Sequence, residues 1–516
     1  MTTTLERSTR LSFLDRQHTV APEGYNRWLI PPAALAVHLC IGQAYATSVY
    51  KTSLVAHFDT SLTAVGVVFS IAIVMLGLSA ALLGTWVDRQ GPRKAMFAAA
   101  SCWAAGFGVG AVGIATSQIW LLYLGYGVIG GIGLGIGYIS PVSTLIKWFP
   151  DRPGLATGMA IMGFGGGALI ASPASRQLLG FYDPEYNPSD AGSLADGRSL
   201  TLLFLTLGIA YFAIMMVGVA NIRVPAPGWR PAGFDPDTVK KRALVTTANV
   251  SAANAIRTPQ FWLLWTVLFC NVTAGIGILE QASPMIQDFF RTGGTSTVTV
   301  AAAGGFVGLL SLFNMAGRFV WSSTSDKIGR KPIYMVYLGV GMVLYLLVAI
   351  TGSVSVVVFV ALAAVILSFY GGGFATIPAY LKDMFGTFQV GAIHGRLLTA
   401  WSLAGVVGPL IVNGFLDAQG KPGSLTAADY RAPLLTMVGV LAVGFVANLL
   451  IRPVADRFHE RGDVSSPVTE GVDAEQVASS TRLPSRPRII ASWALIVALL
   501  TYGVVQTLIT AARLFV

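Results

Sequence analysis

A series of long apolar runs constrains the fold of this 516-residue chain more than any other feature. A helix needs about 20 apolar residues to cross roughly 30 Å of hydrocarbon. Six such runs precede a polar interruption, six follow it, and one more lies near the C-terminus. In chain order, the runs are residues 28–50, 63–86, 95–115, 119–146, 154–180, 200–222, 261–285, 298–323, 334–351, 354–381, 390–415, 432–450 and 489–512. They predict an all-α membrane protein with two six-helix bundles and a thirteenth, C-terminal helix.

The composition supports lipid as the solvent of this chain and argues against nucleic acid as its partner. Hydrophobic residues make up 54% of the sequence and charged residues 11%, whereas soluble domains contain about 25% charged residues. The formal net charge is +10, but the basic residues cluster at the ends of the apolar runs. This distribution indicates membrane topology, so the lipid bilayer is the predicted partner and nucleic acid is not.

The apolar runs divide the chain into segments with different predicted environments. After the twelfth run, mixed charges with many serines and prolines predict disorder. The final run is long enough to span the membrane, although a helix lying in the membrane interface is an alternative. The predicted segments are a cytoplasmic N-terminal tail (1–27), an N-terminal six-helix bundle (28–222), a cytoplasmic linker (223–258), a C-terminal six-helix bundle (259–451), a polar, disordered segment (452–488) and an additional transmembrane helix (489–516).

One short motif occurs once in each half. An aspartate near the end of a helix is followed by a glycine turn and basic residues, between the second and third and again between the eighth and ninth predicted helices. The motif residues are Asp88, Arg89, Gly91, Arg93 and Lys94 in the first copy and Asp326, Lys327, Gly329, Arg330 and Lys331 in the second. The repetition indicates an internal duplication, and ion pairs between these aspartates and basic groups predict a latch on one side of the membrane.

The basic loops also orient the helices. Loops after the second, fourth and eighth runs are rich in lysine and arginine, whereas the opposite loops, such as 182–197 and 419–430, are poorer in them. Basic loops remain on the cytoplasmic side. We therefore expect a multi-pass protein of a bacterial inner membrane with its N-terminus in the cytoplasm.

A single arginine interrupts the eighth run. Arg318 precedes the second motif copy, and the matching position before the first copy is Ala80. An arginine inside a membrane helix costs at least a few kcal/mol. Its planar guanidinium can grip a carboxylate with two parallel hydrogen bonds, which a lysine cannot do. The alternative is an arginine that reaches the membrane interface or pairs within the protein.

The repeated loop resembles the signature loop of the major facilitator superfamily. The stretch 371–409, together with Arg257-Thr258-Pro259-Gln260-Phe261-Trp262 at the start of the seventh run, resembles the oxalate–formate antiporter family, which includes monocarboxylate carriers. The resemblance covers the first twelve helices. It implies a twelve-helix facilitator core that binds substrate near the membrane midplane between two rocking halves.

The resemblance also implies substrate-binding residues. Arg318 matches the family's carboxylate-binding arginine, and a lysine that the oxalate carrier has on its eleventh helix is replaced by Trp401. One cation suits a monoanion, so lactate, pyruvate or formate is favoured over oxalate. The other implied or nearby candidates are Asn314, Gln43, Tyr45, Tyr370 and Phe374, with Tyr138 as a further, less specific one.

These features predict a secondary carrier of small carboxylates that works by anion exchange or with a proton. Glu280, a carboxyl in the seventh run, is the proton-coupling candidate. His38 and His394 are interpreted as packing or interfacial residues and not as metal ligands, because no second histidine or cysteine stands at ligand spacing. The sequence predicts no cofactor, no metal and no enzymatic activity. The alternative is a membrane sensor that binds the acid without net transport. We expect the functional unit to be a monomer.

Overall fold

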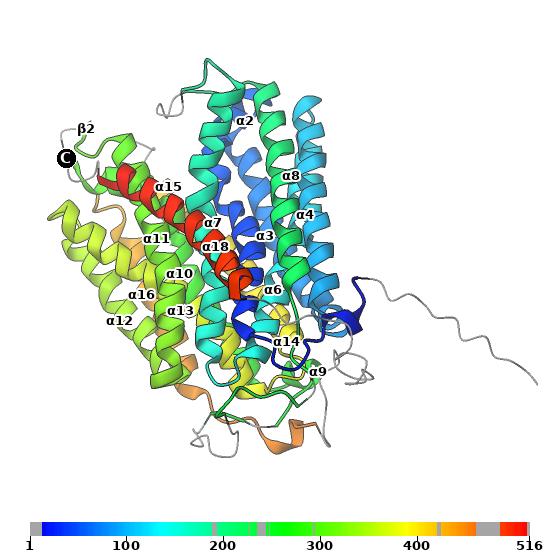
Figure 1. Ribbon diagram of the computed structural model, residues 1–516. Coiled ribbons are helices and arrows are strands. Elements are labelled where there is room, and N and C mark those ends of the chain that lie inside the picture. The colour runs from blue at the N-terminus through cyan, green and yellow to red at the C-terminus, as the bar shows by residue number, and fades with distance from the viewer. Residues whose placement is uncertain are drawn as a thin grey trace, which may run out of the picture.

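The computed structural model describes residues 13–187, 193–226, 228–234, 244–246, 248–292, 295–419, 425–460 and 486–512. This part of the chain is almost entirely helical, and thirteen of its helices are long and apolar enough to cross a membrane. The all-α membrane fold predicted from the apolar runs is therefore confirmed (Figure 1). Much of the predicted tail, linker and polar segment, namely residues 1–12, 235–243 and 461–485, lies outside the described residues.

The first half of the chain forms one bundle. Short turns, η1 (Arg16–Thr19) and η2 (Arg27–Leu29), precede it. Its helices are α1 (Ile30–Ile41), η3 (Gly42–Val49), α2 (Lys51–His57), α3 (Leu62–Gln90), α4 (Pro92–Ala115), α5 (Ile119–Leu122), η4 (Tyr123–Gly130), α6 (Gly131–Trp148), α7 (Pro153–Tyr182) and α8 (Gly197–Asn221).

The second half forms the other bundle, preceded by the short α9 (Ala252–Ala255). A small antiparallel hairpin, β1 (Arg291–Thr292) and β2 (Thr295–Ser296), joins its first two long helices. The helices of this bundle are α10 (Pro259–Phe289), α11 (Val300–Ile328), α12 (Arg330–Thr351), α13 (Val356–Phe385), α14 (Val390–Leu397), α15 (Thr399–Gln419) and α16 (Arg431–Leu450). The turn η5 (Asp456–Phe458) follows them.

Three predicted single helices are interrupted in the structure. The first apolar run changes from α1 to the 3-10 helix η3 at Gly42, the fourth contains the π-helical η4, and the eleventh divides into α14 and α15. At Gly42, an added Cβ would collide with the Phe164 carbonyl of α7. Close packing against α7 therefore requires glycine at the position where the first helix changes its geometry.

The glycines of the two motif copies have the same unusual backbone. Gly91 ends α3 with φ of 85°, and Gly329 ends α11 with φ of 96°. Residues with a side chain rarely adopt this positive φ. The chain therefore makes the same turn at equivalent places in the two halves, as expected for a duplicated unit.

The last helix, α18 (Arg486–Ala511), lies obliquely across the outside of both bundles (Figure 1). Near its start, the Trp493 indole donates a hydrogen bond to the Trp28 carbonyl at 2.9 Å. Farther along, Gly503 packs on Leu169 of α7, and the backbone at Thr510 packs on Gly305 of α11. The thirteenth helix therefore contacts the N-terminal bundle through α7 and the C-terminal bundle through α11.

Candidate functional site

The unmatched arginine is fully buried at the interface between the two halves. Arg318 has 0% of its surface exposed. Its Nε donates to Asn314 Oδ1 at 2.8 Å, one turn away on α11, and its Nη1 donates to the Ile161 carbonyl of α7 at 3.3 Å. Its Nη2 has no hydrogen-bond partner among the described residues. A buried charged donor without a partner is costly, so this nitrogen is the natural place for an anion to bind.

Glycines on α7 make room for this guanidinium. An added Cβ at Gly158 would lie 2.9 Å from the Arg318 carbonyl oxygen, and one at Gly165 would lie 3.0 Å from its Nε. Both distances are too short for ordinary contact, so α7 approaches α11 this closely because these positions lack side chains. The glycine-rich sequence of α7 therefore determines how far Arg318 reaches between the halves.

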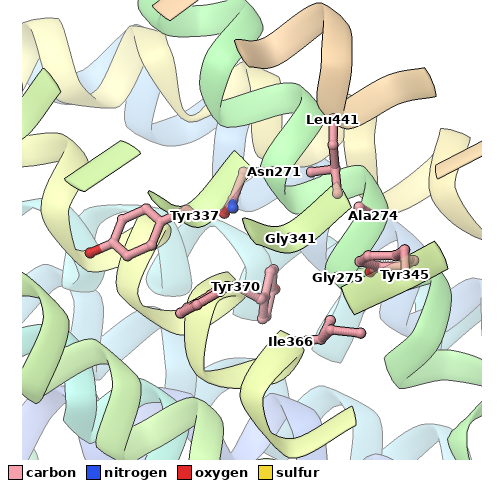
Figure 2. A pocket seen from close by; sticks show the side chains of 10 residues that line it. Asn271, Ala274, Gly275, Tyr337, Gly341, Tyr345, Ile366, Tyr370 and Leu441 are labelled. Carbon is pink, nitrogen blue, oxygen red and sulfur yellow. The ribbon is translucent and has the colours of Figure 1, made fainter. Parts of the chain in front are cut away.

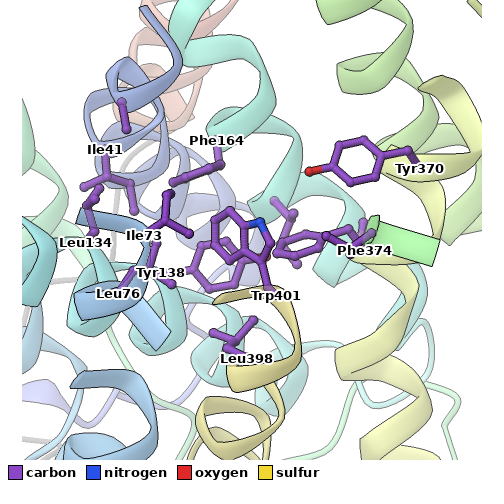
Figure 3. Close-up of a cluster of buried hydrophobic side chains, with 14 of the residues drawn as sticks. Ile41, Ile73, Leu76, Leu134, Tyr138, Phe164, Tyr370, Phe374, Leu398 and Trp401 are labelled. Carbon is purple, nitrogen blue, oxygen red and sulfur yellow. The ribbon is translucent and has the colours of Figure 1, made fainter. Parts of the chain in front are cut away.

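Aromatic rings from both halves lie beside the guanidinium. Figure 3 shows the rings of Phe164, Phe374 and Trp401 lying together. The guanidinium carbon lies 5.2 Å from the centre of Phe374 and 5.9 Å from the centre of Phe164, within reach of a cation–π attraction. Trp401 of α15 packs on Phe374 at 4.8 Å and on Phe164 at 5.6 Å between ring centres. Tyr138 of α6 lies 5.7 Å from Phe374 and 6.0 Å from Trp401. These four rings form an apolar wall beside the buried charge.

Three tyrosine hydroxyls add polar groups to this wall. The hydroxyls of Tyr45, Tyr138 and Tyr370 are buried and have no partner within hydrogen-bonding geometry in the part of the chain described. The charge of Arg318 acts on all three phenols. A small ligand beside Arg318 would thus meet phenol groups that can donate or accept a hydrogen bond.

No carboxylate neutralises Arg318 within the described ranges, because none of their ion pairs includes it. The site therefore combines one buried positive charge, an open donor, phenol hydroxyls and apolar walls. This set of groups can bind one small anion that carries a short apolar body.

The structure gathers most of the residues predicted for substrate binding around this charge. Besides Arg318, they are Asn314, Tyr45, Tyr370, Phe374 and Trp401. Gln43 is not among them. Its Nε2 donates to the Tyr50 hydroxyl at 2.7 Å and its Oε1 accepts from the Tyr126 hydroxyl at 3.1 Å, so its amide is used inside the N-terminal bundle.

Sequence reasoning missed Phe164, which contacts Arg318 from the opposite half. Its only sequence signal is an aromatic residue among glycines, and this signal is not specific.

Glu280 is exposed on α10, and the charged side chain that acts on it is Lys51 of α2. The proton-coupling candidate is therefore not part of the buried cluster.

The motif aspartates join the two halves at the end of the molecule that carries the basic loops. Asp88 of α3 accepts a hydrogen bond from the Ala392 backbone N–H of α14 at 2.9 Å. Asp326 of α11 accepts from the Gly154 and Leu155 N–H groups of α7, both at 2.8 Å. Each carboxylate therefore caps a helix N-terminus of the opposite half, where the helix dipole favours negative charge.

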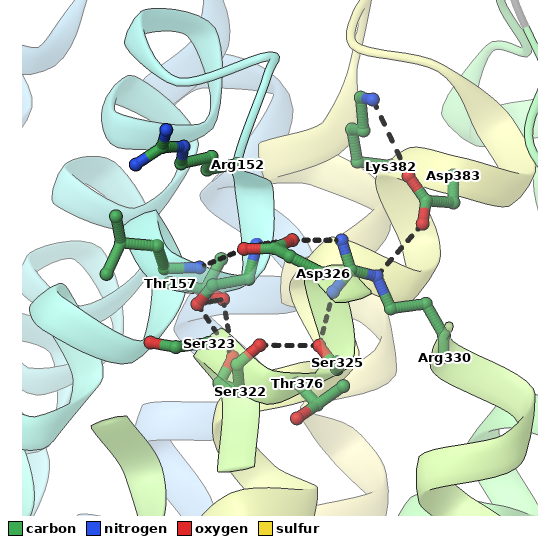
Figure 4. A network of polar contacts seen from close by, with 12 residues as sticks. Arg152, Thr157, Ser322, Ser323, Ser325, Asp326, Arg330, Thr376, Lys382 and Asp383 are labelled. Atoms are coloured by element: carbon green, nitrogen blue, oxygen red, sulfur yellow. Dashed lines mark hydrogen bonds and ion pairs between the residues drawn. The ribbon is translucent and has the colours of Figure 1, made fainter. Parts of the chain in front are cut away.

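In the second motif copy, Arg330 braces Asp326 from within its own half, and the hydrogen bonds of three other basic motif residues go elsewhere. Arg330 forms ion pairs with Asp326 at 2.6 Å and with Asp383 at 2.9 Å (Figure 4). Lys331 donates to the Leu449 and Ile451 carbonyls. In the first copy, Arg93 donates to the Phe13 and Ile222 carbonyls and Lys94 to Gln90, whereas Arg89 and Lys327 are exposed.

A small cavity lies next to Tyr370 inside the C-terminal bundle (Figure 2). It holds about 10 Å³ of water-accessible space, enough for about one water molecule. Asn271 Oδ1 and the hydroxyls of Tyr345 and Tyr370, which belong to residues lining it, have no partner among the residues described. The cavity is too small for a carboxylic acid and suits a single buried water.

The residues described contain no cluster of three or more histidine, cysteine, aspartate or glutamate side chains that could hold a metal ion. Two helical bundles that enclose a buried arginine at their interface and meet through capped helix ends define a class of protein, namely the membrane carriers whose two halves move about a central site.

Sequence comparison identifies the family within this class. The sequence profile of the Major Facilitator Superfamily matches residues 33–409 and 310–515. The chain belongs to the Major Facilitator Superfamily. Its resemblance to the oxalate–formate antiporter family is also confirmed, because it is 27% identical to the oxalate:formate antiporter of Oxalobacter formigenes over 384 residues, covering 74% of this chain and 83% of that one.

Other relatives agree with this assignment. The chain is 28% identical to apicoplast pyruvate carrier 1 of Toxoplasma gondii over 310 residues, covering 52% of this chain and 55% of that one. The crystal structure of the E. coli fucose:proton symporter superposes with a TM-score of 0.59 at 15% identity, covering 82% of this chain and 99% of that one. The fucose symporter shows that the fold is shared, and the family profile and the two sequence relatives make the chain a multi-pass membrane transporter of the Major Facilitator Superfamily.

Proposed function

We propose that this chain is a secondary carrier that moves small monocarboxylates across the membrane by alternating access. The observation that carries the proposal is the unpartnered Nη2 of a fully buried Arg318 at the interface between the halves. A carboxylate bound there would satisfy the open donor and neutralise the buried charge, and a charge-assisted pair of this kind is among the stronger hydrogen bonds in proteins.

The surroundings of Arg318 support a monoanion. Oxalate would bring a second charged group against the rings of Phe374, Phe164 and Trp401, with no second permanent cation beside them in the described part of the chain to receive it. Formate, lactate and pyruvate each bring one carboxylate and, at most, a short chain that fits apolar walls. Two relatives named as an oxalate:formate antiporter and a pyruvate carrier support the same substrate class.

The two aspartate caps support a mechanism for access. In the present conformation they hold the halves together at the end with the basic loops, which we place in the cytoplasm by the positive-inside rule. Rocking of the halves would break the contacts of Asp88 with α14 and of Asp326 with α7 and would open the site to that side. We also propose a monomer as the functional unit.

Transport of radiolabelled acids into proteoliposomes tests the proposal. Pyruvate, lactate, formate and oxalate are supplied outside vesicles that contain either the same acid or none, and protein-free vesicles correct for permeation. We expect saturable uptake of monocarboxylates in preference to oxalate, and internal substrate should accelerate uptake if the carrier exchanges anions. Binding of these acids without any uptake or counterflow would support the sensor alternative, and no binding would refute a carboxylate site.

A further inference from the structure

Two buried histidines from opposite halves flank the same tyrosine beside the carboxylate site. His38 of α1 and His394 of α14 have 0% and 1% of their surfaces exposed. Their ring centres lie 5.2 Å and 5.8 Å from that of Tyr138, which itself packs on the aromatic wall next to Arg318. The three side chains therefore form a row that crosses from one half to the other.

The hydrogen bonds of His38 identify its free nitrogen. Nε2 lies 3.1 Å from the Tyr138 carbonyl oxygen, and because a carbonyl only accepts, this nitrogen carries the hydrogen in the neutral ring. Nδ1 then has a lone pair and no partner among the described residues. The Ala160 carbonyl also lies close to the ring.

His394 offers a second nitrogen without a partner. Its Nε2 is buried and unpartnered in the described part of the chain. It lies on α14, whose N-terminal turn is capped by Asp88 and whose Gly395 packs against the Ala80 carbonyl of α3. His394 is therefore placed on the contact between halves that must separate when the basic end opens.

We propose that His38 and His394 form a proton-binding site that couples proton movement to carboxylate transport. This inference rests on the proposed binding of a carboxylate at Arg318. A proton would be held at His38 Nδ1 while substrate is bound, and His394 would receive or release it when α14 moves away from α3. The chemistry is reversible protonation of imidazole. Burial disfavours the charged ring, so the proton depends on the compensating carboxylate.

Charge links the proton to the substrate. Arg318 and His38 are close enough to repel each other when both are positive, and the same is true of His38 and His394. A carboxylate on Arg318 removes the first repulsion and so favours protonation of His38. By thermodynamic reciprocity, the proton favours carboxylate binding by the same factor. Repulsion between the two imidazoles limits the pair to about one proton, which matches one monocarboxylate.

Other ionisable groups around the pair are few among the described residues. Tyr138 on α6 and Arg318 on α11 face His38. On the side of His394 are Asp88 of α3 and Arg396 of α14. The positive charge of Lys147 on α6 acts electrostatically on Asp88. Asp88 accepts the Ala392 N–H through Oδ2, and its buried Oδ1 has no partner among the described residues. Both histidines pack on Tyr138 beside the carboxylate site.

Proton uptake on substrate binding tests the inference directly. Purified protein in weak buffer with a pH indicator is mixed with pyruvate, lactate or formate near neutral pH, and binding is measured by calorimetry in buffers of different ionisation enthalpy. We expect uptake of about one proton per bound acid in the unmodified protein. His38→Gln, which retains a donor for the Tyr138 carbonyl, should abolish most of the uptake, and His394→Gln should slow transport driven by a pH gradient while leaving exchange at equal pH.

Matched controls separate the possible outcomes. His57→Gln removes a histidine far from the pair, bonded to the Ile114 carbonyl, and should retain proton uptake. Loss of uptake in Glu280→Gln, with both histidine variants unchanged, would overturn the inference in favour of Glu280. Carboxylate binding by the unmodified protein without proton uptake would also overturn it and would leave the proposed function intact. That measurement needs no variant, so misfolding of a histidine variant would not prevent the test. Absence of carboxylate binding would instead refute the proposed function.

Discussion

Replacing Arg318 by lysine tests the carboxylate site while retaining its charge. In the structure the guanidinium uses Nε for Asn314 and Nη1 for the Ile161 carbonyl, and Nη2 remains open. A lysine carries its three donors on one nitrogen atom and lacks the planar fork, so it cannot reach these two separated acceptors and also replace the open Nη2 donor. The variant therefore loses at least one charge-assisted hydrogen bond to the substrate.

The size of the loss follows from that bond. A hydrogen bond to a charged group contributes about 1.5–3 kcal/mol, and each 1.4 kcal/mol changes Kd about tenfold. We expect Arg318→Lys to raise the Kd for pyruvate about ten- to a hundredfold. Calorimetry on purified protein measures this change, and counterflow in proteoliposomes should weaken in parallel.

A matched control distinguishes loss of the site from loss of folding. Arg27 also grips a carboxylate with two bonds, to Asp151 at 2.7 Å and 3.0 Å, but lies near the start of α1. Arg27→Lys should reduce thermal stability slightly and leave the Kd for pyruvate unchanged. An unchanged Kd in a folded Arg318→Lys protein would show that Arg318 is a structural arginine, and the carboxylate site would have to be sought elsewhere.

Three further predictions follow from the same contacts. Trp401→Lys should place a second cation beside the aromatic wall and shift the ratio of oxalate to formate affinity towards oxalate. Competition between the two acids in radiolabelled uptake measures this ratio, and an unchanged ratio would argue against Trp401 as a specificity residue. Asp326→Asn leaves one acceptor oxygen where two backbone N–H groups now bind. The contact between the halves at the basic end should weaken by about 1–3 kcal/mol, and cysteines introduced at that interface should be labelled more. Unaltered labelling would mean that the cap does not hold the halves together. Cysteine at Lys327 should react only with reagents supplied to the cytoplasmic side and cysteine at Ala512 only with external ones, and external labelling at Lys327 would contradict the proposed orientation.

Much of the fold could be predicted from sequence because the membrane imposes a length and a polarity on each helix. Every predicted run corresponds to helix in the structure, and the turns at Gly91 and Gly329 were located by their repeated motif. The break at Gly42 could not be predicted in this way. Its cause is the approach of the Phe164 carbonyl on α7, a contact between segments far apart in the sequence.

The site could be predicted where a residue stood out locally. Arg318 is a charge in an apolar run, and Tyr370 and Phe374 lie four residues apart on one face of their helix. Gln43 has the same local appearance as a ligand residue, but Tyr50 and Tyr126 take up its amide. Such partners are set by how helices pack, and a single sequence does not reveal them.

The packing also changes the interpretation of His38. In the sequence it is a polar residue on an apolar helix and is predicted to be packed. In the structure it is indeed fully buried, yet its Nδ1 faces no donor or acceptor at hydrogen-bonding distance among the described residues. In the proposed mechanism, a carboxylate on the positive Arg318 lowers the cost of a proton on His38, and by reciprocity the proton favours the carboxylate. A monocarboxylate that travels with a proton would use this coupling, because the pair adds no net charge to the buried interface as the halves move.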